Sequence, residues 1–497
     1  MGRAQAAGVA GQDGFDRSRQ AFEGVVAWLG SQDADAMTHA ELEDRLSADM
    51  RQVVCRLFQD HVDLRAEREE RLGDVAGAAG VVHGSLEAGH ERPLATVFGE
   101  VTVRRLAYRH RGEENLYPAD GALNLPGEVY SHGVRRLAAE ESSRGSFDEA
   151  VAAIERGTGQ HVPKRQVEEL ARRAAADFEA FYEGAKRAEA GPADMLVISA
   201  DGKGIVMRPE GLRPGTAKAA ASKKIATRLS KGERPYRTRM AEVGAVYDLS
   251  PVPRRPEDIM GTEKGPAPVA KAKWLTASVA DSAAEVIKAV FDEAARRDPA
   301  HKRTWVALVD GARHQIDRIK AEAKAAKVEV TVVVDFVHVL EYIWKAAWSF
   351  FEVGDPSAEA WVKDEATEVL RSRASVVAGA IRRKATCLGL EPSRRANADT
   401  CADYLLAKSK YLDYATALQK GWPIATGIIE GACRSLVADR MAVTGARWGL
   451  EGAEAVLKLR ALRANGDFPR YWPYHLAQER HRVHESRYAS GVIPRAA

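Results

Sequence analysis

Apolar residues recur at helical spacing through the first 70 residues of the chain. Between residues 39 and 72 the repeating apolar positions are Leu42, Leu46, Met50, Val53, Val54, Leu57 and Phe58. This spacing predicts amphipathic helices over residues 14–70, whose apolar stripe faces a core or a partner helix. A stretch rich in Gly and Ala, residues 73–93, then predicts a linker. Alternating apolar residues around Gly99 and Glu100 predict a β-hairpin over residues 95–112.

Residues 130–185 return to the helical pattern. Ser146 and Glu149 have the spacing of a capping box at the start of one helix, and Pro163 precedes a second helix. Two short helices joined by a turn that contains glycine fit a DNA-binding helix-turn-helix, in which Lys164 and Arg165 would lie where such helices contact bases. An ordinary helical hairpin fits the same spacing, so both interpretations stay open.

From residue 195 onward the pattern mixes strands with helices. It predicts three strands, a helix, a strand, a helix and a strand, over residues 195–200, 204–208, 240–249, 281–297, 305–309, 313–326 and 328–334. The last two strands flank a helix long enough for a right-handed parallel crossover. This order matches an RNase H-like mixed sheet, in which the first and fourth strands are neighbours. Helical spacing then extends from Phe336 to about Gln419, and a final helix begins near Thr426.

Two acidic residues close predicted buried strands, and a third lies on the final helix. Asp201 follows residues 195–200, Asp310 follows residues 305–309, and Glu430 lies far downstream. An isolated charge loses its hydration at the end of a buried strand, so such carboxylates are costly unless they bind something. Hard cations such as Mg²⁺ are held by a few carboxylates together with substrate phosphates. We therefore expect a two-ion site for phosphoryl transfer, with Asp201 bridging both ions and Asp310 and Glu430 each binding one.

Composition and charge narrow the class of protein. The 497 residues are 45% hydrophobic and 29% charged, which is ordinary for a globular protein. The formal net charge is only +3, but residues 202–256 carry 13 Lys or Arg against 4 Asp or Glu. Such a run indicates a solvated loop or a surface for an anionic partner. The four cysteines form no C-x-x-C pair, which argues against a zinc ribbon and fits a reducing cytosol.

Targeting signals are not visible in the sequence. No apolar stretch approaches the ~20 residues that span a bilayer, and the N-terminal residues lack the apolar core of a secretory signal. We therefore expect a cytoplasmic protein with no membrane partner. The chain also has no G-x-x-x-x-G-K-[ST] phosphate loop and no G-x-S-x-G elbow, which argues against an ATP-driven function and against an α/β-hydrolase.

Seven sequence blocks between about residues 90 and 470 carry a resemblance to a known family. Four of them are ISADGKGIVMR, WVALVDGARHQ, VVVDFVHVLEYIW and GIIEGACRSLVADRMAVTGARWGLEGAEAVLKLRAL. The three upstream blocks are TVFGEVTVRRLAYR, LNLPGEVYSHGVRRLAA and SFDEAVAAIERGTG. In this order they resemble bacterial insertion-sequence transposases of the DDE class. The nearest resemblance is to the Kra group, and a more distant one is to Mutator-like transposases.

The resemblance implies an activity, its cofactors and its partners. Asp201, Asp310 and Glu430 would be the catalytic acids and metal ligands. Two Mg²⁺ ions, for which Mn²⁺ can substitute, would support cleavage of transposon ends and transfer of a 3′-hydroxyl into target DNA. Transposon-end DNA and target DNA would be the partners of a homodimer or higher oligomer, associated with the nucleoid when bound to DNA. One departure is the lack of a cysteine-paired zinc module near the N-terminus, so end recognition would rest on the hairpin and the helices.

Together these observations predict an α/β fold: an RNase H-like mixed sheet with a helical insertion, preceded by a mainly helical N-terminal region with a β-hairpin. The predicted segments are an N-terminal helical region and linker (1–90), a hairpin with a helix-turn-helix-like DNA-binding region (91–190), the first part of the catalytic core (191–345), the helical insertion (346–421), the glutamate helix of the core (422–470) and a C-terminal tail (471–497).

Further residues are candidates for contacts with DNA or for a supporting role in the site. The DNA-binding candidates are Lys203, Lys164, Arg165, Arg434, Arg440 and Arg447, and the second-rank candidates are His314, Asp335, His338 and Trp448. Asp335 is suited to cap the following helix, and for it and His338 we favour a structural or substrate-positioning role over metal ligation. Arg434 would hold a phosphate or pair with Glu430 four residues earlier. Trp448 would stack on an unpaired base or, as its residue type favours, lie in the core.

Two other functions remain open. An RNase H-like metal-dependent nuclease or resolvase would cut DNA without joining a 3′-hydroxyl to a target. A repurposed, non-catalytic DNA-binding protein would need no acids at all, and the presence of all three argues against it.

Overall fold

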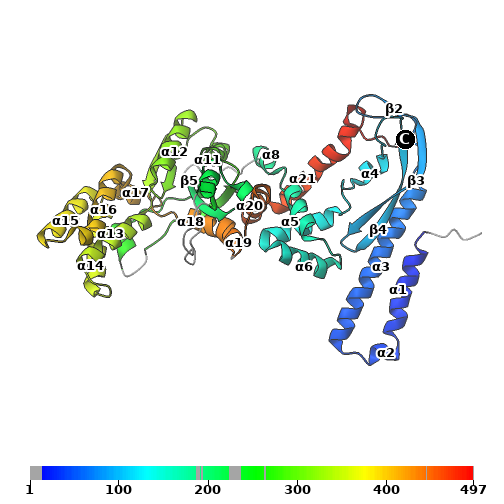
Figure 1. Ribbon diagram of the computed structural model, residues 1–497, viewed down its shortest axis with the longest axis horizontal. Coiled ribbons are helices and arrows are strands. Elements are labelled where there is room, and N and C mark those ends of the chain that lie inside the picture. Colours follow the sequence, from blue (N-terminus) through cyan, green and yellow to red (C-terminus); the bar gives the residue numbers. More distant parts are fainter. Residues whose placement is uncertain are drawn as a thin grey trace, which may run out of the picture. The chain divides into compact units, whose positions relative to one another are not determined.

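The computed structural model describes residues 14–185, 191, 194–222, 237–261, 265–443 and 445–495. The chain divides into two compact units (Figure 1), which we call the N-terminal unit and the sheet unit. The N-terminal unit is Met1–Phe181 with Phe468–Ala497, and the sheet unit is Tyr182–Asp467. Within the basic stretch noted above, residues 223–236 lie outside the described residues.

The N-terminal unit combines helices with a long β-hairpin. Its elements are α1 (Asp16–Leu29), α2 (Gln32–Asp35), α3 (His39–Glu67), β1 (Val75–Ala76), β2 (Val82–His83), β3 (Ser85–Thr96), β4 (Gly99–Arg109), α4 (Pro118–Leu123), α5 (His132–Arg144), α6 (Phe147–Thr158), α7 (Lys164–Ala174), α21 (Phe468–Val483), η4 (Glu485–Arg487) and η5 (Ala489–Gly491), while α8 (Phe178–Glu183) spans the boundary. Val62 of α3 packs on Leu94, Val101 and Val103 of the hairpin. Helices α5, α6 and α7 enclose a second core around Ile154.

The predicted helices and hairpin of this unit are confirmed, but the predicted linker is wrong. Residues 73–93 contain β1, β2 and most of β3, which pairs along its length with β4. The register shifts between Glu87 and His90, where Gly89 has a φ of +78°. The glycine therefore forms a bulge inside the strand, although in sequence it suggests that the strand ends.

The two helices proposed as a helix-turn-helix begin as the sequence predicts. Ser146 and Glu149 make both hydrogen bonds of the capping box on α6, and Pro163 is the residue before α7. Lys164 lies 2.6 Å from Asp148 of α6, an exposed ion pair that contributes little to stability. Binding of DNA by these helices stays a prediction.

The sheet unit is built on a five-stranded mixed sheet in the order β7-β6-β5-β8-β9. The strands are β5 (Met195–Val206), β6 (Thr238–Leu249), β7 (Ala270–Ser278), β8 (Trp305–Val309) and β9 (Val330–Val334). Strand β6 is antiparallel to β5 and β7, while β5, β8 and β9 run parallel. In chain order the first and fourth strands are therefore neighbours, as the sequence predicts.

Two strand predictions in this sheet need correction. The separate strands predicted at 195–200 and 204–208 are one strand, because β5 stays paired with β6 from Met195 through to Val206. Strand β7 was not predicted. It lies at the edge of the sheet, where Lys271 and Lys273 interrupt the apolar pattern in the way that protects an edge strand from pairing further.

Helices cover both faces of this sheet (Figure 1). Apart from α8 and the helical insertion, the described helical elements of this unit are η1 (Pro209–Gly211), α9 (Pro214–Ser222), α10 (Pro256–Met260), α11 (Ala283–Arg297), α12 (Arg313–Ala325), α18 (Gly427–Ala432), the π-helical segment η3 (Cys433–Ala438), α19 (Asp439–Met441) and α20 (Leu450–Ala464). Gly244 of β6 packs directly on Val286 and Val290 of α11. Asp201 points to the opposite face, where it meets Cys433 of η3. The result is a layered α/β unit with the sheet in the middle.

The predicted helical insertion is confirmed between β9 and α18. It consists of α13 (Phe336–Phe350), α14 (Pro356–Leu370), α15 (Ala374–Cys387), α16 (Pro392–Lys408), η2 (Ser409–Tyr411) and α17 (Tyr414–Gln419). Across the described part of the chain, none of the helices combines the length and the apolar character that a bilayer crossing needs.

A buried network of charged groups ties α21 to the end of α7 within the N-terminal unit. The Asp177 carboxylate lies 2.7 Å from Nδ1 of His475 and accepts hydrogen bonds of 2.5 and 2.9 Å from Arg482. The fully buried Arg135 lies 3.2 Å from a carboxylate oxygen of Glu479. Burial alone would raise the pKa of Asp177, but the hydrogen bonds from His475 and Arg482 outweigh it and lower the pKa to about 2.

We predict that acid destabilises the N-terminal unit through Asp177. Its folded pKa of about 2 lies below the unfolded value of about 3.9, so its contribution is present above the unfolded pKa and is lost as the pH falls through the folded one. Asp177→Asn should remove about 2 kcal/mol of unfolding free energy at neutral pH and much less at about pH 2. Urea unfolding followed by circular dichroism measures both values. The exposed Asp148→Asn is the control, and an equal loss in both variants would contradict the prediction.

Candidate metal centre

The centre of the candidate site is Asp335, the residue that links β9 to α13. Its side chain is fully buried, and its Oδ1 accepts a hydrogen bond of 3.0 Å from the backbone N–H of Val337. This bond caps α13, which confirms the capping role suggested by the sequence. Its Oδ2 accepts a hydrogen bond of 2.6 Å from the hydroxyl of Thr426 and lies 3.2 Å from Nδ1 of His338.

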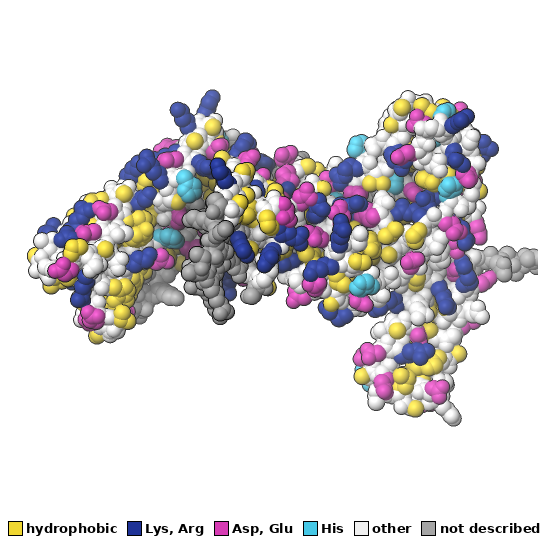
Figure 2. Space-filling view, viewed as in Figure 1, with side chains coloured by type: hydrophobic (Ala, Val, Ile, Leu, Met, Phe, Trp, Pro, Cys, Tyr) yellow, Lys and Arg dark blue, Asp and Glu magenta, His cyan; other side chains and the backbone are white. Residues whose placement is uncertain are grey.

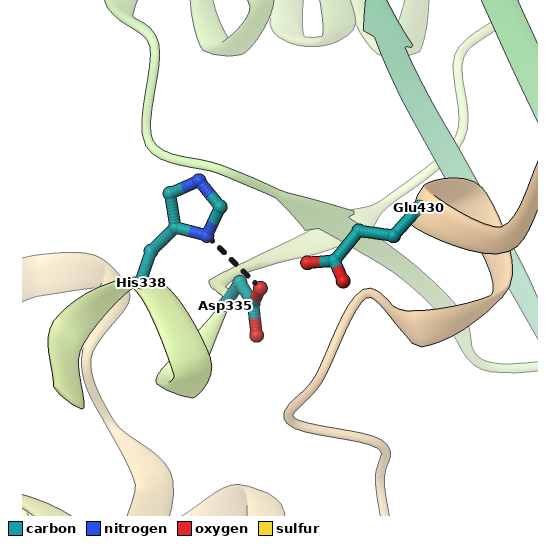
Figure 3. Close-up of side chains that lie close together, drawn as sticks. All are labelled: Asp335, His338 and Glu430. Atoms are coloured by element: carbon teal, nitrogen blue, oxygen red, sulfur yellow. Dashed lines mark hydrogen bonds and ion pairs between the residues drawn. The ribbon is translucent and has the colours of Figure 1, made fainter. Parts of the chain in front are cut away.

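Glu430 reaches the same place from α18. The Thr426 hydroxyl, which lies next to Asp335, is also 3.1 Å from Oε1 of Glu430. Figure 3 shows the Glu430 carboxylate pointing toward Asp335, with the His338 ring reaching Asp335 from α13. One ligand atom from each of Asp335, His338 and Glu430 lies within 4.8 Å of the other two. Residues far apart in sequence therefore form a compact group of oxygen and nitrogen donors.

The spacing of this group is close to that of ligand atoms around a divalent ion. An octahedral Mg²⁺ ion holds adjacent ligand atoms about 3.0 Å apart and opposite ones about 4.2 Å apart, since each bond is about 2.1 Å long. The ligand atoms of Asp335, His338 and Glu430 lie within 4.8 Å of one another, so all three would have to move closer to share one ion. Carboxylates suit Mg²⁺ and Mn²⁺, while an imidazole favours softer ions.

Asp201 and Asp310 lie on the strands next to this group but are not members of it. On β5 and β8 they each come two residues after the paired residues Ser199 and Leu308. On β8 and β9, Asp310 and Asp335 each follow directly on a paired residue, and the backbone N–H of Asp335 donates to the carbonyl of Val309 at 2.8 Å. Because neighbouring strands lie about 4.8 Å apart, the register puts the three aspartates at one level of three adjacent strands.

Asp201 and Asp310 each make local hydrogen bonds. Oδ1 of Asp201 accepts from the backbone N–H of Gly202 at 2.7 Å, and its Oδ2 lies 3.4 Å from the Cys433 thiol sulfur. Oδ1 of Asp310 accepts from the backbone N–H of Ala312 at 2.8 Å. The prediction that Asp201 closes a strand is wrong, because its pairing with β6 continues through to Val206 and Asp201 lies within β5.

Titratable groups around these carboxylates have shifted pKa values. Burial, reinforced by the neighbouring Asp201, raises the pKa of the Cys433 thiol far above its usual range, so the thiol stays protonated. Burial also raises the pKa of the Tyr404 phenol, and the negative charges of Asp310 and Asp335 add to this. The protonated groups next to the acids are therefore hydrogen-bond donors.

Sequence reasoning missed Glu242, the partner of Gly202 across β5 and β6. Burial raises the pKa of its carboxyl, and Asp201 raises it further against the opposing effect of His314. The side chain lies over Gly202, where an added Cβ would be 3.4 Å from Glu242 Oε2. A signal existed, because Glu242 is an acid near the start of a largely apolar strand, but its link to Asp201 depends on the register of β5 with β6.

The remaining candidates from the sequence are spread over the surface and the core. Lys203, Arg165, Arg447 and His314 are exposed. The Arg434 side chain is 83% exposed and lies 3.7 Å from Asp439, so its ion-pair partner is not Glu430.

Arg440 and Trp448 lie in the core of the sheet unit. Trp448 is 6% exposed, and its indole N–H donates to the Met441 carbonyl at 3.2 Å. The Arg440 guanidinium lies 4.6 Å from the centre of the Trp448 ring. Trp448 thus takes the core position that its residue type favours, and a DNA contact by either residue would require this packing to open.

Comparison with known proteins gives no relative for this chain: no family model matches it, and no curated protein matches it.

We predict that Thr426→Val weakens the sheet unit and its candidate metal centre. The hydroxyl is one of three donors around the buried Asp335 carboxylate, and a buried acceptor that loses a partner costs about 1–3 kcal/mol. Urea unfolding should show this loss. Thr400→Val on the exposed face of α16 is the matched control, because its hydroxyl bonds only to the Ala396 carbonyl of its own helix. An equal loss in both variants would contradict the role given to Thr426.

Proposed function

We propose that this protein is a DNA transposase of an insertion sequence. It would cleave transposon ends and transfer their 3′-hydroxyl into target DNA, in a reaction that depends on divalent ions. The observation that carries this proposal is the placement of Asp201, Asp310 and Asp335 at one level of adjacent parallel strands, with Glu430 brought to them by α18. Carboxylates gathered at one level of the sheet repel one another, and bound cations would compensate that repulsion.

The sheet supports the finer part of the proposal, an RNase H-like catalytic core. Its adjacent strands β5 and β8 are the neighbours expected for that fold from the sequence. The helical insertion between β9 and α18 also supports the proposal, because several distant relatives of such transposases have an insertion there.

The residues of the site would have different roles in the reaction. Asp201, Asp310 and Glu430 would hold the ions, and His338 would add a nitrogen ligand or contact a phosphate. Asp335 would orient His338, and the Thr426 hydroxyl, whose one proton can be donated to either Asp335 or Glu430, would hold these two carboxylates in place. Divalent ions bound there would activate an attacking oxygen and stabilise a leaving oxygen at phosphorus.

Contacts with DNA would come from exposed cations near the acids. Lys203 is exposed and lies two residues beyond Asp201, on the same face of β5. Figure 2 shows Lys and Arg side chains interspersed with Asp and Glu over the visible face, with no extended surface of a single sign. DNA would therefore be held by local clusters of cations, and binding of two transposon ends would need at least a dimer.

We predict that Asp201→Asn, Asp310→Asn and Glu430→Gln each abolish DNA strand cleavage and joining while binding of transposon-end DNA survives. Each change removes the negative charge with little change of shape, so the loss would report on metal-dependent chemistry. Cleavage and strand transfer of a labelled end in Mg²⁺ or Mn²⁺, together with a mobility-shift assay, measure the three activities. Asp317→Asn, an exposed acid of α12, is the control.

The same assay separates the alternatives. A pre-cleaved end that is joined to target supports the transposase, whereas cutting without joining indicates a nuclease or resolvase. Full activity in any of the three variants would remove that residue from the proposed site. Binding without any cleavage by the unmodified protein would favour a non-catalytic DNA-binding protein.

A further inference from the structure

Cys433 is the residue directly after α18, and its side chain contacts Asp201. It lies at the start of the π-helical segment η3, three residues after Glu430. Its thiol sulfur is 3.4 Å from Oδ2 of Asp201, while Oδ1 of Asp201 accepts from the backbone N–H of Gly202. Among the described residues, each oxygen of the Asp201 carboxylate therefore has one hydrogen-bond donor, and the thiol is the donor that comes from outside β5.

We propose that Cys433 is a positioning residue for Asp201. Its thiol holds the carboxylate turned toward the helix that carries Glu430, so that both acids face the same ion position. This inference rests on the proposed function in one respect, namely that Asp201 is a metal ligand.

The helix geometry explains why this residue can act on both acids. Residues three apart on a helix lie on the same face, so Glu430 and Cys433 both point toward the strand ends. The chain then continues as a π-helix, a local widening that is common at functional sites. A rotation of this helix would move Glu430 together with Cys433, the residue that donates a hydrogen bond to Asp201.

A thiol suits this position better than a hydroxyl. Cys433 is 6% exposed, and a buried thiol is unreactive and stays protonated. The S–H group is a weak hydrogen-bond donor. It therefore holds the carboxylate in place, but this hydrogen bond breaks at a small free-energy cost when an ion binds. A serine would bond more strongly over a shorter reach, and an alanine would leave Oδ2 of Asp201 without its partner.

The hydrogen bond itself can be tested without DNA or metal. The S–H stretching band of Cys433 is isolated as the infrared difference between the unmodified protein and Cys433→Ser. We expect this band at the low frequency of a thiol bonded to a carboxylate, and we expect it to shift upward in Asp201→Asn. A band that Asp201→Asn leaves unchanged would overturn the proposed contact.

The positioning role is tested by Mn²⁺ binding, measured from the electron paramagnetic resonance signal of the free ion. Loss of a residue that orients a metal ligand weakens metal affinity by about 10–100-fold, and we expect Cys433→Ala to fall in this range. Cys433→Ser keeps a donor and should recover most of the affinity. Cys387→Ser, at an exposed cysteine of α15, should bind as the unmodified protein does. Thermal unfolding of each variant shows whether the fold is retained.

The outcomes separate this inference from the proposed function. Equal Mn²⁺ affinity in Cys433→Ala and the unmodified protein overturns the positioning role, even if strand cleavage still requires Asp201. Weakened binding in Cys433→Ala with recovery in Cys433→Ser supports it, even if no strand transfer is found. Weakened binding in both variants to the same extent would assign Cys433 to packing alone and would also overturn the inference.

Discussion

A carboxylate removed from water must be compensated by hydrogen-bond donors, and this requirement applies to Asp335, whose side chain is fully buried in the sheet unit. Its donors come from α13 and from Thr426, which follows the whole insertion. The backbone N–H of Phe336 also donates to the Ile424 carbonyl at 2.8 Å. The insertion therefore begins and ends at one place, and its length adds little to the entropy of closing the loop. This junction keeps Glu430 at the end of the sheet, although a long helical segment separates it from β9.

The acids of the site differ in how completely the chain compensates them. Asp335 is buried and has three donors, so it has little capacity left for another strong partner. Asp201 is only partly buried and has a backbone N–H and a weak thiol, and Asp310 has a backbone N–H on one oxygen. Glu430 is exposed and shares the Thr426 hydroxyl with Asp335. The less compensated carboxylates are the ones that gain most from a cation, which is why we assign orientation to Asp335 and ion binding to the other three.

Much of the sheet unit could be predicted from the sequence, because its buried strands are short apolar runs and its helices have clear caps. The exact bounds of β8 follow from such local signals. The adjacency of β5 and β8 was expected from the match of the strand order to an RNase H-like sheet, and the crossover rule applied to β8 and β9. Strand β7 was not predicted, because two lysines at the sheet edge interrupt its apolar pattern. The grouping of Glu430 with Asp335 and His338 also escaped prediction as a metal centre, since it depends on Thr426 returning to β9, a contact that no local spacing encodes.

Asp201 and Asp310 are each followed by a glycine, and the two glycines have different structural roles. Gly311 follows Asp310 with a φ of +97°, which other residues rarely adopt, and an added Cβ would lie 2.9 Å from the Tyr404 hydroxyl. That hydroxyl donates to the Asp310 carbonyl at 3.3 Å, so the insertion packs on the turn that holds the second acid. Gly202 instead stays in an ordinary strand, where an added Cβ would lie 2.8 Å from Cε of Met240 and 3.4 Å from Oε2 of Glu242. One glycine thus shapes the backbone beside its acid, and the other leaves room for side chains of the neighbouring strand β6, so that the surroundings of Asp201 and Asp310 depend on residues outside their own strands.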